Sequence, residues 1–561
     1  MLFQLFNKKC GPLNTGYLFL NVMIVVILSM ILSQFYKSYF ENNLIVINDS
    51  RPYRRLCAHR DYGNGATVCV CNKNYCDDLR PITRTPVGVI KVYETSKSGD
   101  RFAESELQFI KTAFNLTEPN SYYTSDVHIN INRSQTYQKI IGFGGAFTDS
   151  AGLNIRTLSN DLQRQVISDY FADTGIEYSL GRIPIGGSDF STHPYTYDDV
   201  EGDFGLEHFA LTLEDLDYKI PYIKLAQELA SNEIKLYGSP WSSPAWMKTN
   251  HKINNGGFLI GEPGNKYYQT FANYFIKFLD AYTKRNVSLW GITVENEPNA
   301  GYNDKYLWNS LGFSPELQRD FIKQDLGPIL AKHGYGVDKL KLMINDDQRP
   351  TVSHWARVIL SDKKAAKYVS GSAFHWYEST PENVVQLDTT HNEFPDYFLL
   401  SSEACEEWKG KTEKVSLGNW HTFDRYTNDI ITDLNHWTGG WTDWNLALDL
   451  QGGPNWVGNY VDAPIIINRT SNEYYKQPFF YALGHFSKFL SPDSVRIGSV
   501  TKPESVSGIQ VTSFRRTDKS TALVVYNQNN ESITLSINDP KFGVVNSIIK
   551  ANSLQTYLWF D

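Results

Sequence analysis

The stretch LWGITVENEPNA, residues 289–300, decides how the rest of the chain is interpreted. It begins with an apolar, β-branched run of strand length that breaks at Pro298, so Glu295, Asn296 and Glu297 stand where the strand should end. A strand this apolar suits a sheet covered on both faces, and in parallel sheets functional groups gather at the carboxyl ends. A solvated turn is the alternative interpretation. A second carboxylate at another strand end would favour a catalytic site.

The surrounding pattern predicts a barrel, because from about residue 139 short apolar runs alternate with helical stretches. We expect strands at residues 140–144, 179–184, 234–238, 289–294, 341–345, 369–375, 397–401 and 439–444. Helical patterns lie between them, at residues 213–230, 266–284, 315–332 and 423–436. Eight βα units predict an α/β protein with a (β/α)8 TIM barrel over residues 138–445.

The pattern changes on both sides of the predicted barrel. After residue 446 a strand is expected at 465–467 and a helix at 478–490. Short alternating strands then follow at 509–514, 522–526, 533–537, 544–549 and 556–559. They predict an accessory β-sandwich whose second part is residues 494–561 and whose first part is residues 85–137. Residues of about 478–493 are expected to join the barrel.

The seventh predicted strand supplies the second carboxylate. The segment YFLLSSEAC, residues 397–405, is apolar at first and then ends at Glu403. The fourth and seventh strands of such a barrel lie across its mouth from one another, so Glu297 and Glu403 can face each other across a sugar. A separation of about 5 to 5.5 Å would make Glu403 a nucleophile, whereas a wider gap would admit water and lead to inversion. The sequence leaves this choice open.

Composition and charge narrow the classes of ligand. Aromatic residues make up 14% of the chain, which suits a cleft where sugar rings stack on aromatic faces, although a well-filled core would also account for them. The formal net charge of −8 argues against nucleic acid as a partner. The sequence predicts no metal site and no cofactor.

The N-terminus indicates entry into the secretory pathway. Lys8 and Lys9 precede an apolar run at residues 17–32, so residues 1–36 are either a signal peptide or an uncleaved signal anchor. Either interpretation places the rest of the chain in a lumen. Six glycosylation sequons agree with this, at Asn48, Asn115, Asn132, Asn286, Asn468 and Asn530.

Four cysteines crowd together at Cys57, Cys69, Cys71 and Cys76. In a reducing cytosol such a cluster would suggest zinc, but in an oxidising lumen disulfides are favoured. The spacing permits three pairings and does not choose among them. Cys405 is then left unpaired.

Several segments together resemble glycoside hydrolase family 30, and within it the lysosomal acid β-glucosylceramidases. They include GFGGAFTD (142–149), SPWSSPAW (239–246), ENEPNAG (295–301), SSEAC (401–405), GGPNWVGNYVDAPIIIN (452–468) and YKQPFFYALGHFSKF (475–489). The resemblance runs from about residue 57 to the end. It implies a barrel, a β-sandwich and a small three-stranded sheet, with Cys57 joined to Cys69 and Cys71 to Cys76. The small sheet is expected in a β subdomain of residues 57–84, completed by about 446–477.

The resemblance also implies a role for each site residue. Glu297 matches the acid/base, Glu403 the nucleophile, and Asn296 a partner of the sugar 2-hydroxyl. The negative charge of Glu403 is expected to raise the pKa of Glu297, and Asp443 is expected to pair with Arg182. The remaining substrate-binding positions are Asp189, Trp241, Trp444 and Asn459 on the glucose, His375, Trp376 and Tyr377 after the sixth strand, and Phe190, Tyr306 and Trp308 on the lipid side.

The expected function is hydrolysis of glucosylceramide to glucose and ceramide through a covalent glycosyl-enzyme. The expected location is the lysosome, with the enzyme peripheral to a membrane surface and aided by a saposin-like activator. One alternative keeps the mechanism and changes the substrate to a xyloside or a steryl glucoside. Another alternative is a non-catalytic lysosomal lectin or trafficking protein.

Overall fold

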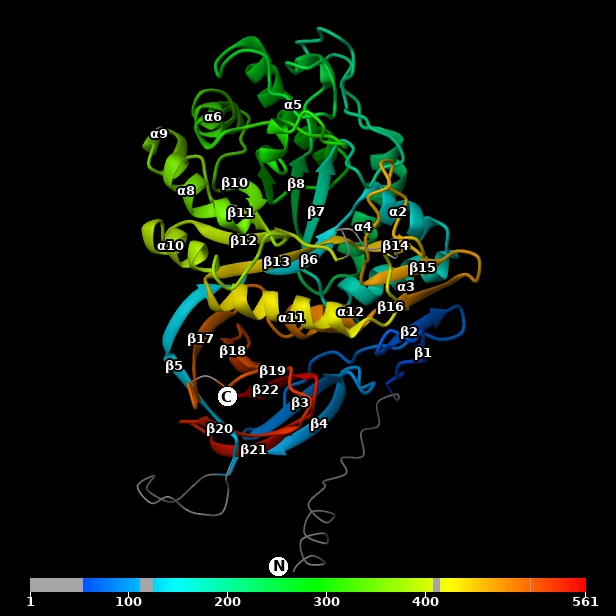
Figure 1. The fold of residues 1–561 in the computed structure, drawn as a ribbon, viewed down its shortest axis with the longest axis vertical. Coiled ribbons are helices and arrows are strands. Elements are labelled where there is room, and N and C mark those ends of the chain that lie inside the picture. Colours follow the sequence, from blue (N-terminus) through cyan, green and yellow to red (C-terminus); the bar gives the residue numbers. More distant parts are fainter. Residues whose placement is uncertain (1–53, 111–124, 407–413, 505) are drawn as a thin grey trace, which may run out of the picture. The chain divides into compact units, whose positions relative to one another are not determined.

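The computed structural model describes residues 54–110, 125–406, 414–504 and 506–561. The predicted signal or anchor, residues 1–36, and the sequons Asn48 and Asn115 lie outside these ranges. None of the helices in the described ranges has the length and apolar character needed to cross a membrane. Three sheets organise this part of the chain: a closed barrel, a nine-stranded sheet and a five-stranded sheet (Figure 1).

The barrel confirms the predicted fold class and all eight predicted strands. Its strands follow one another around the ring in chain order and pair in parallel. They are β6 (Gly142–Ala146), β7 (Leu180–Ile185), β8 (Lys235–Pro240), β9 (Gly291–Thr293), β10 (Lys341–Gln348), β11 (Gly371–His375), β12 (Phe398–Glu403) and β13 (Thr438–Asn445).

Two strands continue beyond their apolar segments into polar residues. β10 was expected to end at residue 345 and continues to Gln348, and β12 includes Glu403. The polar residues at these ends still pair with the neighbouring strand, which an apolar pattern does not reveal. As a result the carboxyl ends of these strands carry several buried polar side chains into the barrel mouth.

Helices surround the barrel, and those at the five predicted segments are accompanied by others that were not predicted. They are α2 (Asp149–Arg156), α3 (Asn160–Phe171), α4 (Ile220–Leu229), α5 (Lys266–Thr283), α6 (Pro315–Phe321), α7 (Gly327–Lys332), α8 (Val352–Leu360), α9 (Lys363–Ala366), α10 (Val385–Glu393), α11 (Trp420–Asn435) and α12 (Pro478–Ser487). Two predicted helices contain π-helical turns, at Glu214–Lys219 and Ile322–Leu326. Each turn ends two residues before a proline, Pro221 or Pro328, whose missing N–H disturbs the regular hydrogen-bond ladder.

The nine-stranded sheet combines residues from both ends of the chain, in the order β21-β20-β5-β17-β18-β19-β22-β3-β4. Its strands are β3 (Val89–Ser96), β4 (Ala103–Gln108), β5 (Val127–Lys139), β17 (Val495–Lys502), β18 (Ile509–Arg515), β19 (Ser520–Asn527), β20 (Ile533–Asp539), β21 (Gly543–Ile549) and β22 (Ser553–Phe560). Ile110 and Val544 exchange two backbone hydrogen bonds, of 2.9 and 3.1 Å, so the two ends of the sheet meet. The sheet therefore folds over one shared apolar core.

Helices α11 and α12 lie between the barrel and the nine-stranded sheet (Figure 1). At this interface His485 of α12 is fully buried, and its two ring nitrogens lie 2.8 Å from the hydroxyl of Thr556 and 2.9 Å from that of Thr95. Burial lowers the pKa of His485 to about 3. The imidazole at the interface is therefore neutral.

The disulfide-bearing sheet is larger than the resemblance implies. It has five strands instead of three: β1 (His59–Asp61), β2 (Thr67–Asn72), β16 (Glu473–Lys476), β15 (Ile465–Asn468) and β14 (Ala447–Asp449). Residues 447–476 supply three of these strands, and β14 begins directly after the last barrel strand. The sheet is thus continuous in sequence with the barrel.

Two disulfides hold the N-terminal part of this sheet. Cys57 is bonded to Cys69 and Cys71 to Cys76, the pairing that the resemblance implies, and Cys405 is free and buried. Each bridge spans few residues, 12 and 5 positions apart in sequence. On the chain-entropy model, closing such short loops removes about 2 to 3 kcal/mol of unfolded-state freedom per bridge.

Candidate active site

Glu297 sits on a strained turn at the end of β9. It precedes the short 3-10 helix Pro298–Tyr302, and its backbone is left-handed, with φ 45° and ψ 57°. Such a conformation costs a non-glycine residue about 1–3 kcal/mol and persists only when its surroundings impose it. Here the backbone N–H of Glu297 donates to the carbonyl of Asp346, at 2.9 Å, and that of Asn296 donates to the carbonyl of Pro240, at 2.8 Å. Strands β10 and β8 therefore fix the turn from both sides.

Glu403 ends β12 and is 6% exposed. One of its oxygens forms an ion pair with the guanidinium of Arg182, and the other accepts a hydrogen bond of 2.7 Å from the Tyr377 hydroxyl. Its position is thus fixed by a cation from β7 and a phenol that follows β11.

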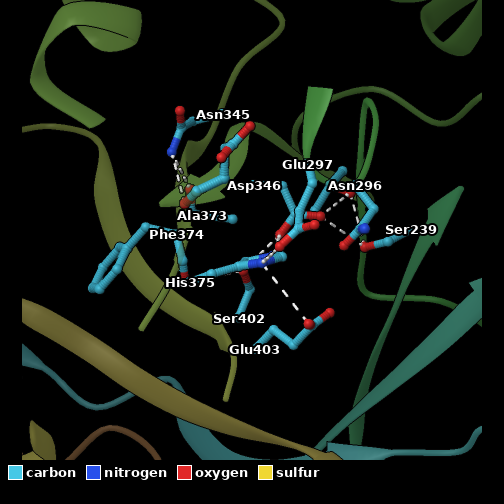
Figure 2. A network of polar contacts seen from close by, with 12 residues as sticks. Ser239, Asn296, Glu297, Asn345, Asp346, Ala373, Phe374, His375, Ser402 and Glu403 are labelled. Carbon is cyan, nitrogen blue, oxygen red and sulfur yellow. Dashed lines mark hydrogen bonds and ion pairs between the residues drawn. The ribbon is translucent and has the colours of Figure 1, made fainter. Parts of the chain in front are cut away.

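The two carboxylates face the same imidazole (Figure 2). Nδ1 of His375 lies 3.2 Å from Oε1 of Glu297 and 3.9 Å from Oε1 of Glu403. One oxygen of each carboxylate and this nitrogen lie within 4.8 Å of one another. Retaining glycosidases hold their carboxyl groups about 5 to 5.5 Å apart, and inverting ones about 6.5 to 9.5 Å. The nearest oxygens of the two carboxylates are thus closer than the inverting range, which favours the retaining geometry and leaves little room for an intervening water.

Three donors surround the Glu297 carboxylate. Tyr306 donates to Oε2 at 2.7 Å, Gln348 donates to Oε1 at 3.0 Å, and His375 also contacts Oε1. Burial acts to raise the pKa of Glu297, but the hydrogen bond and charge of His375, together with Tyr306 and Arg182, lower it below its usual value. The net shift is therefore downward, opposite to the raised pKa that was expected, because donors next to the carboxylate outweigh the like charge of Glu403 further away.

His375 is fully buried and supports the site from below. Its second nitrogen, Nε2, lies 3.2 Å from Oδ1 of Asp346. Burial acts to lower the pKa of His375, but the negative charges of Glu403, Asp346 and Glu297 raise it to about 10. Because each ring nitrogen faces a carboxylate oxygen, the imidazole carries two protons and a positive charge.

Arg182 is the second buried cation of the site. Besides Glu403 it donates to Oδ1 of Asn296, at 2.8 Å, and to Oδ2 of Asp346, at 3.0 Å. The predicted pair of Arg182 with Asp443 is wrong. Asp443 instead accepts a hydrogen bond of 2.7 Å from Tyr426.

A cavity of about 270 Å³ opens in front of the two carboxylates. Eleven of the thirteen predicted catalytic and substrate-binding residues line it: Asp189, Phe190, Trp241, Asn296, Glu297, Tyr306, Trp308, Tyr377, Glu403, Trp444 and Asn459. Its size is at the lower end of small-molecule sites. The cavity therefore suits a short ligand segment rather than a long chain of sugars.

Aromatic rings and one acid form the inner wall. The rings of Trp241 and Trp444 stack with centroids 5.0 Å apart, and the guanidinium of Arg182 lies over both. Asp189 accepts hydrogen bonds from Asn455, at 3.1 Å, and Asn459, at 2.9 Å. Burial raises the pKa of Asp189 to about 7.

Two predicted site residues, His375 and Trp376, do not line the cavity. His375 contacts both carboxylates from beneath. Trp376 donates its indole N–H to the carbonyl of Cys405, at 3.1 Å, and packs edge-on against Tyr426 and Trp441. It belongs to the wall behind the site, because its side chain turns away from the barrel mouth.

Sequence reasoning also missed several residues. Ala300, Asp347, Gln348, Glu378 and Cys405 line the cavity, and Asp346 lies beneath it. One signal was available, since the acids at positions 346 and 347 directly follow the predicted strand 341–345.

The described residues contain three clusters of His, Cys and carboxylate groups close enough to hold a metal. Two of them include disulfide-bonded cysteines, whose sulfurs are not free to bind. The third is Glu297, His375 and Glu403. A doubly protonated imidazole offers no lone pair to a cation, so this cluster suits proton chemistry better than metal binding.

A parallel barrel with two acids at its mouth, an aromatic-lined cavity and a retaining separation defines a glycoside hydrolase. The chain belongs to glycosyl hydrolase family 30: residues 140–490 match the family's TIM-barrel domain, and residues 493–557 match its β-sandwich domain. This family assignment confirms the predicted enzyme class.

Named relatives are similar over nearly the whole chain. It is 43% identical to "Lysosomal acid glucosylceramidase" of Mus musculus over 506 residues, 90% of this chain and 95% of that one. It is 42% identical to "Putative glucosylceramidase 4" of Caenorhabditis elegans over 505 residues, 89% of this chain and 94% of that one. Among solved structures, SrfJ from Salmonella typhimurium superimposes with a TM-score of 0.75 at 27% identity, covering 84% of this chain and all of that one.

Proposed function

We propose that the protein is a retaining β-glucosidase that hydrolyses glucosylceramide to glucose and ceramide. The observation that carries the mechanism is the closeness of Glu297 and Glu403, which share contact with His375 within 4.8 Å. The names of the relatives support the substrate, because two of them are called glucosylceramidases and match about nine-tenths of the chain.

In the first step Glu403 attacks the anomeric carbon and the bond to the aglycone oxygen breaks. Glu297 gives its proton to that oxygen as it leaves. In the second step water attacks the same carbon, the bond to Glu403 breaks and Glu297 takes the proton of the water. Arg182 keeps the nucleophile in place, and the three donors around Glu297 stabilise the carboxylate form that acts as the base.

The wall residues are assigned to the sugar. Asp189 and Asn459 would bind glucose hydroxyls, Trp241 and Trp444 would cover an apolar face of the ring, and Asn296 would bind the 2-hydroxyl. Arg182 donates to Oδ1 of Asn296, which orients the amide so that its NH2 group supplies the donors. This bond strengthens as positive charge develops on the sugar.

The lipid side is assigned to the segment after Glu297. Tyr306 and Trp308 line the cavity, whereas Tyr302 and Leu307, in the same segment, are 59% and 61% exposed. Exposed apolar side chains beside the mouth suit contact with a bilayer surface or with a saposin-like activator. We place the enzyme in the lysosomal lumen, peripheral to the membrane, in line with its two disulfides and its lysosomal relative.

Separate mutation of the two acids tests the assignment. With a dinitrophenyl β-glucoside the leaving group needs no proton, so Glu297→Ala should still form the glycosyl-enzyme and then stall. Added azide should restore turnover and give the β-glucosyl azide. Glu403→Gly should form no intermediate and should escape labelling by a 2-fluoroglucoside.

Peptide mapping and product analysis provide the readout. The labelled peptide of the unaltered enzyme should contain Glu403, and the first product should be β-glucose. A label on Glu297, or release of α-glucose first, would refute the assignment. Retained sugar binding without turnover would favour the lectin alternative. Turnover of a steryl glucoside but not of short-chain glucosylceramide would change the assigned substrate and leave the assigned mechanism intact.

A further inference from the structure

Asp346 connects the ends of several barrel strands at the barrel mouth, although it does not line the cavity. It lies on β10, and its carboxylate accepts from side chains of five other strands. Figure 2 shows three of these donors, Ser239, His375 and Ser402. The donors are Arg182 of β7 at 3.0 Å, Ser239 of β8 at 3.1 Å, Thr293 of β9 at 2.7 Å, His375 of β11 at 3.2 Å and Ser402 of β12 at 2.6 Å. Six consecutive strands thus meet at one side chain.

The surroundings make this carboxylate a permanent anion. It is fully buried and its backbone is left-handed, with φ 57°. Burial acts to raise the pKa of Asp346, but the charge of Arg182, the contact and charge of His375 and the Ser402 hydroxyl hold it far below its usual value. The carboxylate of Asp346 therefore stays ionised at a pH where an ordinary aspartate would begin to take up a proton.

The ionised groups of the cluster can be counted. Arg182 and His375 are cations, and Asp346 and Glu403 are anions, so these four sum to zero. In the free enzyme this cluster is therefore neutral when Glu297 carries its proton. Once Glu403 is esterified by the sugar the four groups sum to one positive charge, and the cluster is neutral only when Glu297 is ionised.

These two neutral states are the two that catalysis requires. We propose that Asp346 is a positioning residue whose fixed negative charge offsets one of the two cations, so that Glu297 can hold its proton until Glu403 is esterified. The proposal rests on the assignment of Glu297 and Glu403 above. Buried net charge is costly, so the negative charge of Asp346 opposes the lowering of the pKa of Glu297 by His375 and Arg182, and loss of the Glu403 charge then lowers that pKa further.

Other ionisable groups lie close to the cluster. Burial raises the pKa of Asp189, which lines the same cavity, to about 7, so this carboxyl group is neutral at acid pH. Burial raises the pKa of Glu295 well above its usual value and that of Asp347 to about 6, and it raises the pKa of Tyr237 and of Tyr377 above the usual value of a phenol. Glu295 and both tyrosines are therefore neutral at acid pH. Asp347 titrates beside Glu297, so it broadens the transition without changing the sign of the effect.

The variant Asp346→Asn removes the charge with little change of shape. Two cations would then face two carboxylates, which favours the ionised form of Glu297, so the proton needed for the first step is lost at lower pH. The alkaline limb of kcat/KM for an alkyl β-glucoside should move to lower pH by about one unit or more. The limb for a dinitrophenyl β-glucoside, whose leaving group needs no proton, should stay in place.

Two further variants separate charge from structure. Thr293→Val removes one hydrogen bond to the same carboxylate without changing the charge. The alkaline limb of kcat/KM of this variant should lie at the same pH as that of the unaltered enzyme. Adding His375→Asn to Asp346→Asn also removes one cation. The charges of the cluster then balance again, so the alkaline limb of kcat/KM should move back toward its original pH. A merely structural role predicts an unshifted limb in Asp346→Asn and further damage in the double variant, and either result overturns the proposal.

Labelling of Glu403 by a dinitrophenyl 2-fluoroglucoside distinguishes the two levels of failure. If the unaltered enzyme is not labelled there, the assignment of the acids fails. If it is labelled and Asp346→Asn is labelled with an unshifted limb, the role of Asp346 alone is rejected. If Asp346→Asn does not fold, the 15N spectrum of His375 in the unaltered enzyme decides: two protons throughout the active pH range support the count, and a neutral ring overturns it.

Discussion

Glu297 shows how a catalytic residue depends on neighbours that take no part in the chemistry. Its left-handed backbone aims the carboxylate into the barrel mouth, and hydrogen bonds from the turn to Pro240 and Asp346 impose that conformation. Glycine would adopt the same backbone without strain, but it has no carboxylate. The stability lost at this residue is offset by the backbone bonds of the adjoining strands.

Asn296 provides the prediction at this scale. We expect Asn296→Ala to lower kcat/KM for a β-glucoside by about 2 to 4 kcal/mol of transition-state stabilisation, because it removes a donor to the 2-hydroxyl. For a 2-deoxy-β-glucoside, which cannot form that bond, the loss should be much smaller. Equal losses on both substrates would instead point to disturbance of Arg182, which also contacts this amide.

Glu297 and Glu403 could be predicted from sequence because each directly follows an apolar strand, and the position of a strand end is a local property. The network around Asp346 could not be, because its five donors come from strands that meet only when the barrel closes. The direction of the pKa shift of Glu297 was wrong for the same reason. The pKa of Glu297 depends on donors that lie about 3 Å from its carboxylate in the folded protein, and the sequence does not show which side chains these are.

Among the elements, strands were predicted better than helices. The apolar runs were short and bounded by polar or turn residues, so all eight barrel strands were found. The helical patterns gave the correct position but not the π turns before Pro221 and Pro328. The five-stranded sheet exceeded the expectation because β1 is exposed and β14 lies in a loop-like segment, and neither has the alternation that marks a strand.

One buried lysine attaches this sheet to the barrel. Lys476 of β16 lies 2.8 Å from Asp77, which follows β2, and 3.5 Å from Asp169 of α3. All three side chains are buried. Tyr474 and Tyr481 donate to the same two carboxylates, at 2.6 and 2.7 Å.

We expect Lys476→Met to lower the free energy of unfolding by about 3 to 5 kcal/mol, because it leaves two buried carboxylates without their cation. Urea unfolding followed by tryptophan fluorescence measures the loss. Lys73→Met is the matched control, since Lys73 is exposed in the turn after β2 and its replacement should change stability by less than about 0.5 kcal/mol. A small effect of Lys476→Met would show that the sheet is held by its disulfides and apolar contacts alone.

For the whole molecule, acid stability depends on His485 at the interface of barrel and sheet. Its pKa is about 3 in the folded protein against an ordinary 6.5, so below pH 6.5 the unfolded chain binds a proton that the folded protein does not. Stability should fall as the pH drops through this range, by about 1.4 kcal/mol per unit.

We therefore expect His485→Gln to be less sensitive to acid than the unaltered protein. The difference between their free energies of unfolding should change by about 2 to 3 kcal/mol between pH 7.5 and pH 4.5. His354→Gln, at an exposed site on α8, is the control and should follow the unaltered protein. A parallel pH dependence for His485→Gln and the unaltered protein would mean that the ring is already protonated in the folded state.

The nine-stranded sheet also sets the order in which the molecule can be completed. β3 and β4 are among the first strands to leave the ribosome, yet the other neighbour of β3 is β22, the last strand of the chain. During synthesis one edge of β3 must wait, unpaired, while the whole barrel is translated. A chain that stopped short of Ser553 would lack the strand between β19 and β3 and would leave both of their edges open to other chains.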